Sequence, residues 1–582
     1  MCGIVAIIGN ELNKDRIAEV IGSLSHRGPD AEGVWLSRTS KCVLAHRRLS
    51  IIDLSEDGNQ PMCSDMNRYC IILNGEIYNY LEIKEELKDN YDFRTQTDTE
   101  VLLAAFQRWG ISCFDRLIGM FACVIWDEQT QTAIAVRDRF GVKPLYYTQL
   151  PGGELAISSE IKIFHELGLP RDTDVSTWAT YLTYGFYDNS ERTFWNGVQS
   201  LPPGHYLTID NKISVNKWYD LRDRIRQSET RNEDEVMNEY CNMLEESVNL
   251  RFRSDVSVGI NLSGGLDSSI LLGLAQKNQS DVDAFTFITG EPLYDELPWV
   301  QQMLEGYPNP HHVCMLEANE VPSLAAKVQK NQDEPFGGLP TLGYAKIFER
   351  ARDIGVKVLL DGQGMDEQWA GYDYYYSALS ENLHASNKLP IVPLQGCSTK
   401  PIRPECLIPD FRDNAVYFMP PSLPSDALTN LQCWDIRYSK LPKALRFNDR
   451  VSMMYSIELR EPFLDHRLFE IALNQPIERK IQNGINKWLL RRIAKELLPS
   501  RIVNASKRPL QVAQIEWFKG HLKNWVESMI EVALEQYGDV WLDVKSVRRE
   551  WNQFVNTQTD NSFYIWQWVS IGLFHECFLR SK

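Results

Sequence analysis

The sequence predicts two domains of different class: an α+β domain in the N-terminal part, and an α/β domain with a doubly wound parallel sheet in the C-terminal part. The chain has 582 residues, which is too many for one ordinary hydrophobic core. Hydrophobic residues make up 43% of it and charged residues 24%, as in globular proteins. Short apolar runs are arranged differently in the two parts, and this difference separates the two fold classes.

The N-terminal part mixes apolar runs of strand length with two longer stretches that have apolar residues at helical spacing. The runs are residues 4–8, 43–45, 71–73, 121–126 and 133–136. The helix-like stretches are residues 14–25 and 99–109. Helices packed on sheet in layers account for this mixture, so we predict an α+β domain.

A charged stretch, residues 218–236, has little to bury and is a candidate linker or exposed helix start. We place the boundary within residues 207–235 and assign residues 1–210 to the first domain and 235–582 to the second. Strands and helices alternate beyond it. The strands are expected at residues 256–262, 284–288 and 356–360, and the helices at 268–276 and 341–354. This alternation favours a parallel sheet with a ligand crevice at the carboxyl ends of its strands.

Two segments of the second domain lie outside this alternation. Residues 378–425 contain eight prolines and no clear period, so we expect an irregular excursion, either a lid or recognition element or a tolerated surface insertion. The C-terminal region is rich in tryptophan, which we expect to pack the core of a helical cap. These tryptophans are Trp517, Trp525, Trp541, Trp551, Trp566 and Trp568.

The net charge of −17 disfavours nucleic acid and anionic lipid as partners. No run reaches the roughly 20 apolar residues of a membrane span, and the start of the chain lacks the pattern of a signal peptide. We therefore expect a cytoplasmic protein with no membrane partner. The twelve cysteines show no C-x-x-C pair and no metal-ligand spacing, so we predict buried free thiols, with Cys2 as the exception.

Cys2 is a candidate nucleophile. Removal of Met1 would put its thiol and a free α-amino group on the same residue. The thiol has an ordinary pKa of about 8.5 and the α-amino group one of about 7.7–8.0, so the amine can share the thiol proton near neutrality. The residue would carry its own base, although cysteines also occur at position 2 with no role.

A second candidate site is the stretch V-G-I-N-L-S-G-G-L-D-S-S, residues 258–269. Gly264 and Gly265 lie between a predicted strand and a predicted helix, where the backbone can approach a phosphate and the helix N-terminus can attract it. The stretch lacks the G-K-[ST] ending of a Walker loop. A plain connection between strand and helix is the alternative interpretation.

Eight ordered segments of the first domain together resemble the N-terminal-nucleophile glutaminase of glutamine-hydrolysing asparagine synthetases. They are MCGIVAIIG (1–9), SHRGPD (25–30), LAHRRLSIID (44–53), NQPM (59–62), NGEIYNY (74–80), TDTE (97–100), RDRFGVKPLYY (137–147) and SSEIK (158–162). The resemblance implies an Ntn-hydrolase-like layered sandwich (αββα). It also implies that Cys2 attacks glutamine while Asn74 and the Gly75 backbone N–H stabilise the oxyanion.

The same resemblance implies a binding site for glutamine. Arg48 would bind its α-carboxylate, and Glu76 and Asp98 would bind its α-ammonium group. Asn74 would also take part in binding glutamine. A hairpin turn at Asn74-Gly75 and a surface ion pair at Arg48 are the ordinary alternatives.

The second domain resembles the synthetase part of the same family. Its glycine-rich loop resembles the pyrophosphatase-type loop of enzymes that cleave ATP to AMP and pyrophosphate. Residues 361–367 (D-G-Q-G-M-D-E), 370–372 (A-G-Y) and 445–468 resemble later signatures. The resemblance implies a sheet like that of adenine nucleotide alpha hydrolases, with helical additions. The residues expected to bind ATP and pyrophosphate are Leu262, Ser263, Gly264, Gly265, Asp267, Ser268, Gly362 and Lys507.

Two carboxylates from separate loops, Asp267 and Asp366, would suit Mg²⁺ that bridges the ATP phosphates. Lys507, in S-K-R-P, is expected to steady the charge of pyrophosphate, and Arg450 to support the site. Lys487 and Arg491 follow the last signature, and no role is assigned to them.

The chain departs from the family at Gln363, where asparagine synthetases usually carry a glutamate. A carboxylate can deprotonate incoming ammonium, whereas an amide takes no proton at neutral pH. Glu367, Asp366 and Tyr372 are candidates to replace it, and we assign Gln363, Glu367 and Tyr372 to the acceptor site. The acceptor is either aspartate or another carboxylate, such as a sugar acid or a natural-product intermediate. We favour the second and expect the proline-rich excursion to take part in its recognition.

The predicted protein is a glutamine-dependent amidotransferase that uses ATP and Mg²⁺. Its partners are small molecules, namely glutamine, ATP and the acceptor carboxylate, and the sequence is compatible with a homodimer. One rival is a ring-closing amide synthetase with the same adenylation, which would have no use for a glutaminase. The other is a non-catalytic homologue, which would not be expected to retain Cys2 and Lys507.

Overall fold

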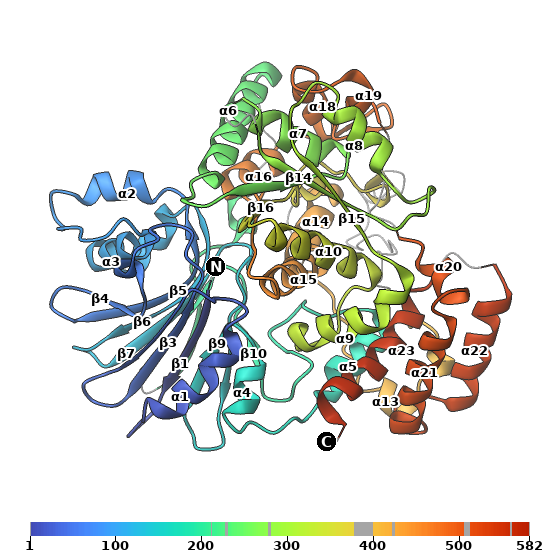
Figure 1. The fold of residues 1–582 in the computed structure, drawn as a ribbon, viewed down its shortest axis with the longest axis horizontal. Helices are drawn as coiled ribbons and strands as arrows, with labels where there is room; N and C mark the ends of the chain where they lie inside the picture. Colours follow the sequence, from blue (N-terminus) through green and yellow to red (C-terminus); the bar gives the residue numbers. More distant parts are fainter. Residues whose placement is uncertain are drawn as a thin grey trace.

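The computed structural model describes residues 2–210, 212–226, 231–277, 281–376, 400–421, 425–505, 512–558 and 561–580. Figure 1 shows an N-terminal part, in blue and cyan, beside a C-terminal part coloured from green to red. Two antiparallel sheets build the first part and a parallel sheet the second. The predicted combination of an α+β domain and an α/β domain is therefore confirmed.

Each N-terminal sheet has six strands. The spatial order of the first is β10 (Gln199–Ser200), β8 (Tyr146–Gln149), β9 (Leu155–Ser158), β1 (Gly3–Ile8), β3 (Cys42–Arg48) and β2 (Ala31–Leu36). The order of the second is β12 (Ile213–Lys217), β11 (His205–Ile209), β7 (Thr132–Arg137), β6 (Gly119–Asp127), β5 (Tyr69–Ile77) and β4 (Met62–Cys63).

The alternation of side chains along the strands produces four layers. In β1, Ile4 and Ala6 pack between the sheets, whereas Val5 and Ile7 face the helical side, because successive side chains of a strand point to opposite faces. The outer face of the first sheet is covered by α1 (Asp15–Val20) and α4 (Lys162–Glu166). Buried residues of α2 (Tyr80–Leu87) and α3 (Asp98–Trp109) cover the second.

The parallel sheet has the order β15 (His311–Met315), β14 (Asp283–Ile288), β13 (Val258–Asn261), β16 (Val358–Leu360) and β17 (Glu458–Arg460). The chain proceeds from β13 outward in one direction through β14, and in the other through β16. The strand order thus reverses at β13, where open α/β sheets form a ligand crevice at the carboxyl ends of their strands.

Helices cover both faces of this sheet, as the continuous apolar strands require. On one face lie α6 (Glu233–Arg251) and α7 (Leu266–Ala275), and on the other α10 (Leu339–Asp353) and α15 (Leu441–Met453). Further helices of this part are α8 (Leu297–Leu304), α9 (Val321–Gln332), α11 (Met365–Gln368), α14 (Ala427–Trp434), α16 (His466–Leu473), α17 (Ile477–Lys480), α18 (Trp488–Ala494) and α19 (Ser500–Val503).

A helical cap closes the C-terminal end, at the lower right of Figure 1. It consists of α20 (Gln514–Lys519), α21 (Lys523–Tyr537), α22 (Val544–Asn556) and α23 (Phe563–Phe574). Five of the six tryptophans predicted to pack here are buried, and Trp525 is partly buried. Their expected role as core residues of the cap is confirmed.

Several local predictions differ from the structure. Cys63 and Cys70 form a disulfide, so the prediction that all cysteines other than Cys2 are free thiols was wrong for this pair. The register of β4 with β5 explains it, because Cys63 lies directly opposite Cys70. Nine other described cysteines are free, and Cys241 and Cys577 among them are half-buried.

The charged stretch 218–236 also buries more than its composition suggests. Tyr219 and Leu221 pack into an apolar cluster with residues of α15 and α16, and α6 begins inside the stretch at Glu233. Among the described residues, no helix is long and apolar enough to cross a membrane.

Candidate active sites

The predicted nucleophile lies against a buried amide. Cys2 is 6% exposed, and its backbone nitrogen donates to Asn74 Oδ1 at 3.1 Å. Asn74 lies on β5 with a fully buried side chain, and its Nδ2 has no hydrogen-bond partner in the described part of the chain. A buried amide donor without a partner costs free energy unless a ligand uses it. Burial also raises the pKa of the Cys2 thiol, which keeps it protonated until a base takes the proton.

Gly75 lies where no side chain fits. Its φ of +150° is rare for other residues, and a Cβ there would lie 2.0 Å from the carbonyl oxygen of Met120 on β6. The close pairing of β5 with β6 therefore requires glycine directly after Asn74.

The Arg48 guanidinium is held by oxygen atoms of the loop that follows β3. It donates to the Ser55 carbonyl at 2.6 Å, to Asn59 Oδ1 at 3.0 Å and to the Asp53 carbonyl. Gly58 leaves room for it, because a Cβ there would lie 2.2 Å from Nη2. Arg48 is thus a buried, positioned cation, and the alternative of a surface ion pair was wrong.

Two buried carboxyl groups, Glu76 and Asp98, lie close enough to interact electrostatically. Asp98 accepts from the Ile77 backbone N–H at 2.8 Å, and burial raises its pKa to about 6. Burial, followed by the charges of Glu458 and Asp98, raises the pKa of Glu76 well above its ordinary value. Glu76 Oε2 has no hydrogen-bond partner among the described residues. An ammonium ion is the natural ligand for such a pair, because it favours their ionised forms.

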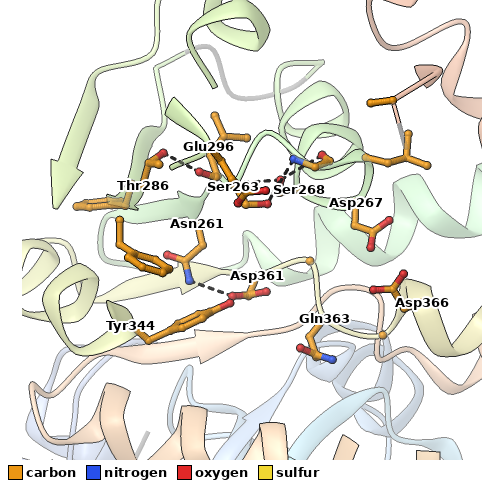
Figure 2. A pocket seen from close by; sticks show the side chains of 18 of the residues that line it. Asn261, Ser263, Asp267, Ser268, Thr286, Glu296, Tyr344, Asp361, Gln363 and Asp366 are labelled. Carbon is orange, nitrogen blue, oxygen red and sulfur yellow. Dashed lines mark hydrogen bonds between the residues drawn. The ribbon is translucent and has the colours of Figure 1, made fainter. Parts of the chain in front are cut away.

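A cavity of about 350 Å³ opens at the carboxyl ends of β13, β14 and β16. The glycine-rich loop forms one wall, and Figure 2 shows Ser263 and Ser268 there. Ser268 Oγ lies 3.1 Å from Ser263 Oγ and 3.2 Å from the Ser263 backbone nitrogen, which fixes the turn into α7. Gly264 has a φ of +68°, and a Cβ there would lie 2.8 Å from the Trp299 Cβ. Leu262, Gly265 and Gly362 also line the cavity.

The two carboxylates predicted to bind Mg²⁺ share one ammonium group. Lys487 Nζ lies 2.7 Å from both carboxylate oxygens of Asp267 and 2.6 Å from Asp366 Oδ1. Burial opposes the charge of this lysine, but the two carboxylates raise its pKa above the ordinary value. Paired carboxylate oxygens beside a phosphate loop are the donors that Mg²⁺ prefers, so the residues present fit this ion. Lys507 lies outside the described residues.

The opposite wall contains the predicted acceptor residues. Gln363 and Tyr372 line the cavity, and Figure 2 shows Gln363 on the far side of Asp361 from Ser263. Glu367 does not line the cavity. It is fully buried behind Tyr372, whose hydroxyl donates to Glu367 Oε1 at 2.7 Å, and burial raises its pKa to about 7.

The lining residues that were not singled out from the sequence, or were given no role there, include Asn261, Asp361, Tyr344, Lys487 and Arg491. Asn261 Nδ2 donates to Asp361 Oδ2 at 3.0 Å. Both residues end neighbouring parallel strands, and this position could have revealed them. Lys487 directly precedes α18, and Tyr344 lies on α10. Only the tertiary structure brings these two side chains to the cavity.

A network of buried charges joins the two parts of the molecule. Arg27 donates to the Cys2 carbonyl at 3.0 Å, to Asp449 at 2.9 and 3.2 Å, and to Glu160 at 3.0 Å. Arg450 pairs with Glu160 at 2.9 Å and with Asp333 at 3.2 Å. Arg450 therefore lies at the junction and does not line the cavity. The network connects residues beside the thiol to α15 of the second part.

The described part of the proline-rich excursion is mostly irregular, as expected, but it contains a 3-10 turn at Pro404–Cys406 and the short helix α13 (Pro409–Arg412). It packs against the helical cap. Phe411 stacks on Trp541 with ring centroids 4.9 Å apart. No described residue of the excursion lines the cavity. Residues 377–399 and 422–424 lie outside the described residues, so the expected contribution to acceptor recognition stays a prediction.

Together, the layered antiparallel sandwich with the Cys2 thiol and the parallel sheet with its glycine-rich loop define a two-domain glutamine amidotransferase. Residues 1–219 match the family model described as a glutamine amidotransferase domain, and residues 239–576 match the one described as asparagine synthase. The chain belongs to the glutamine-hydrolysing asparagine synthetase family. It is a carbon–nitrogen ligase, and the family resemblance seen in the sequence is confirmed.

Curated relatives cover nearly the whole chain, and two of them show the range of names. "Asparagine synthetase [glutamine-hydrolyzing] 1" of Bacillus subtilis is 29% identical, over 100% of this chain and 98% of the relative. "Amidase chry2" of Gibberella zeae is 28% identical, over 92% of each chain. Among solved structures, glutamine phosphoribosylpyrophosphate amidotransferase from B. subtilis has 15% identity and a TM-score of 0.30, covering 54% of this chain and 81% of that chain.

Proposed function

We propose that the protein frees ammonia from glutamine at Cys2 and joins it to a carboxylate that ATP has adenylated in the cavity. The observation that carries this proposal is the Asn74 amide, which accepts from the Cys2 backbone and whose Nδ2 has no partner among the described residues, in a chain that also has a glycine-rich loop of the phosphate-binding type. We place the glutaminase in residues 1–210 and the synthetase in residues 235–582.

In the glutaminase, the α-amino group of Cys2 would take the thiol proton once Met1 is removed. The sulfur then attacks the glutamine amide, and Asn74 Nδ2 and the Gly75 N–H donate to the oxyanion. Collapse releases ammonia and leaves a thioester, which water hydrolyses to glutamate. Arg48 holds the α-carboxylate, while Glu76 and Asp98 hold the α-ammonium.

In the synthetase, the acceptor carboxylate attacks the α-phosphorus of ATP, and pyrophosphate leaves. Ser263, Gly265 and the start of α7 would surround the phosphates, because the free N–H groups of a helix N-terminus favour anions. Asp267 and Asp366 would hold Mg²⁺, which supplies positive charge to the phosphates. Ammonia then displaces AMP from the acyl-adenylate to form the amide.

We propose that the acceptor is a carboxylate other than aspartate, such as a sugar acid or a natural-product intermediate. The Gln363 amide on the acceptor wall supports this, because it cannot take a proton from incoming ammonia. Aspartate is the second candidate, favoured by the full-length similarity to a protein named as an asparagine synthetase.

Two experiments test these proposals. Cys2→Ala should abolish amide formation from glutamine and preserve it with added ammonium, and loss of both reactions would refute the division of labour. For the acceptor, the protein is incubated with ATP, Mg²⁺, amide-¹⁵N-glutamine and a panel of carboxylates that includes aspartate. The carboxylate that acquires ¹⁵N and causes AMP release is the acceptor, whereas ADP as the nucleotide product would refute adenylation.

A further inference from the structure

A buried carboxylate with no assigned role lies next to the acceptor wall. Glu461 directly follows β17, as Asp361 directly follows the neighbouring strand β16. The two strand ends are joined by a hydrogen bond from the Asp361 backbone nitrogen to the Arg460 carbonyl at 2.9 Å. Glu461 is 5% exposed.

The loops that continue from these strand ends pack on each other. A Cβ on Gly364 would lie 2.7 Å from Leu464 Cδ2 and 3.4 Å from the Phe463 carbonyl oxygen. Gln363 precedes Gly364 and lines the cavity. The loop of Glu461 therefore backs the loop that carries Gln363.

Glu461 also interacts with the glutaminase part. The charged groups that act on its carboxyl are Lys143 and Asp138 of the loop after β7, Asp361 of the cavity wall, and Asp449 of α15. The hydroxyl of Tyr344, on α10, is affected by the charge of Glu461 in turn. Glu461 is thus in electrostatic contact with both halves of the molecule.

A chain of contacts leads from the Cys2 backbone carbonyl to this position. Arg27 binds the Cys2 carbonyl and Asp449, and Lys143 Nζ lies 3.7 Å from Asp449 Oδ1. Lys143 is in turn the main cation acting on Glu461. The carboxylate therefore lies at the far end of the polar junction. Glu461 does not itself line the cavity, but it interacts electrostatically with Asp361 and Tyr344, which do.

Other carboxylates around the cavity already have strong partners. Asp267 and Asp366 bind the Lys487 ammonium, and Asp361 accepts from the Asn261 amide. Glu367 accepts from Tyr372, and the charges that act on it belong to the synthetase half. Glu461 Oε2 is buried and has no hydrogen-bond partner among the described residues, which is also true of Glu367 Oε2, so Glu461 differs from Glu367 by its interactions with both halves of the molecule. A buried acceptor of this kind can accept a hydrogen bond from a ligand that has an N–H or O–H group, such as ammonia.

We propose that Glu461 is the proton acceptor for ammonia that passes from the glutaminase to the acyl-adenylate. This inference rests on the proposed function. The ammonia nitrogen forms the new C–N bond, the C–O bond to AMP breaks, and its electron pair leaves with AMP. One N–H proton passes to the Glu461 carboxylate, which becomes a carboxylic acid and later releases the proton to solvent.

The protonation equilibrium of Glu461 suits this role. Burial raises the pKa of its carboxyl to about 8, Lys143 opposes the shift, and the nearby Asp361, Asp449 and Asp138 add to it. A group that titrates near the working pH can both take and return a proton.

The test replaces the carboxylate with an amide of the same shape, Glu461→Gln. Three rates are measured in the full-length protein: glutamate release from glutamine, exchange of pyrophosphate into ATP, and ¹⁵N-amide formation from ¹⁵N-glutamine. The acceptor is the panel carboxylate that supports AMP release in the unaltered protein. We expect amide formation to fall by about 10²–10⁴-fold, the usual contribution of a positioned acid or base, with the other two rates within a few-fold.

Two further variants separate chemistry from structure. The double variant Glu461→Gln with Gln363→Glu should regain much of the amide formation, because it places a carboxylate on the acceptor wall, in the loop that the Glu461 loop backs. Glu334→Gln is the matched control. Glu334 is also a buried carboxyl whose pKa burial raises, to about 7, but it accepts from the Phe194 backbone away from the cavity, and amide formation should persist.

Each other outcome has a definite meaning. Unchanged amide formation in Glu461→Gln, or selective loss in Glu367→Gln instead, would overturn the role of Glu461 alone. Parallel loss of all three rates without rescue by Gln363→Glu would also overturn it, in favour of a structural role. No AMP release from the unaltered protein with any carboxylate would refute the proposed function, and this inference with it.

Discussion

Asn74→Ala is the sharpest test of the glutaminase geometry. The variant removes a buried amide whose Oδ1 accepts from Cys2 at 3.1 Å and whose Nδ2 has no partner in the described chain. If Nδ2 donates to the oxyanion, its loss should lower kcat for glutamine hydrolysis by about 10²–10³-fold, or about 2.7–4 kcal/mol. The lost hydrogen bond to Cys2 should also lower the free energy of unfolding by about 1–3 kcal/mol.

The assay follows glutamate release at saturating glutamine, and amide formation with ammonium as the nitrogen source. The second rate should be preserved, since the synthetase cavity is built by other strands. Asn59→Ala is the matched control, because Asn59 Oδ1 accepts from Arg48 at 3.0 Å. This control should raise KM for glutamine and leave kcat nearly unchanged. A fall in kcat of less than tenfold for Asn74→Ala, or equal loss of the ammonium reaction, would refute the assigned donor.

Three more predictions concern charge. Burial raises the pKa of Asp98 to about 6, and a bound ammonium group favours its ionised form, so KM for glutamine should rise as the pH falls below about 6. Asp98→Asn should flatten this pH dependence of KM, and a flat profile in the unaltered protein would contradict the prediction. Asp449→Asn removes the carboxylate that pairs with the buried Arg27. The free energy of unfolding, measured in urea, should fall by about 3–5 kcal/mol. A loss below about 1 kcal/mol would argue against the junction as a stabilising contact. Lys487→Met leaves the carboxylates of Asp267 and Asp366 without their shared cation. Exchange of pyrophosphate into ATP should slow at least tenfold. An unchanged exchange rate would exclude Lys487 from the site.

Much of the fold could be predicted because its signals are local. The alternating pattern of Ile4 to Ile8 and the glycine-rich turn at Gly264 each act over a few residues, so the sequence displays them directly. Helix and strand ends were less accurate. The stretch predicted as one helix over 14–25 is an α-helix to Val20 followed by a 3-10 turn at Ile21–Leu24.

The cysteine pair shows the limit of spacing arguments. Cys63 and Cys70 are too far apart in sequence for a C-x-x-C motif, yet the β4–β5 register puts them side by side. Similarly, the charged composition of residues 218–236 concealed Tyr219 and Leu221, which other elements bury.

The sequence by itself determined the two fold classes, the family and the candidate residues Cys2, Asn74 and Asp267, because each is recognised from its immediate neighbours in the chain. The tertiary structure alone decided which charges meet. It brought Lys487 between Asp267 and Asp366, and Glu461 to the junction of the two halves. These contacts depend on strand order and on packing between residues far apart in sequence, and no local pattern records them.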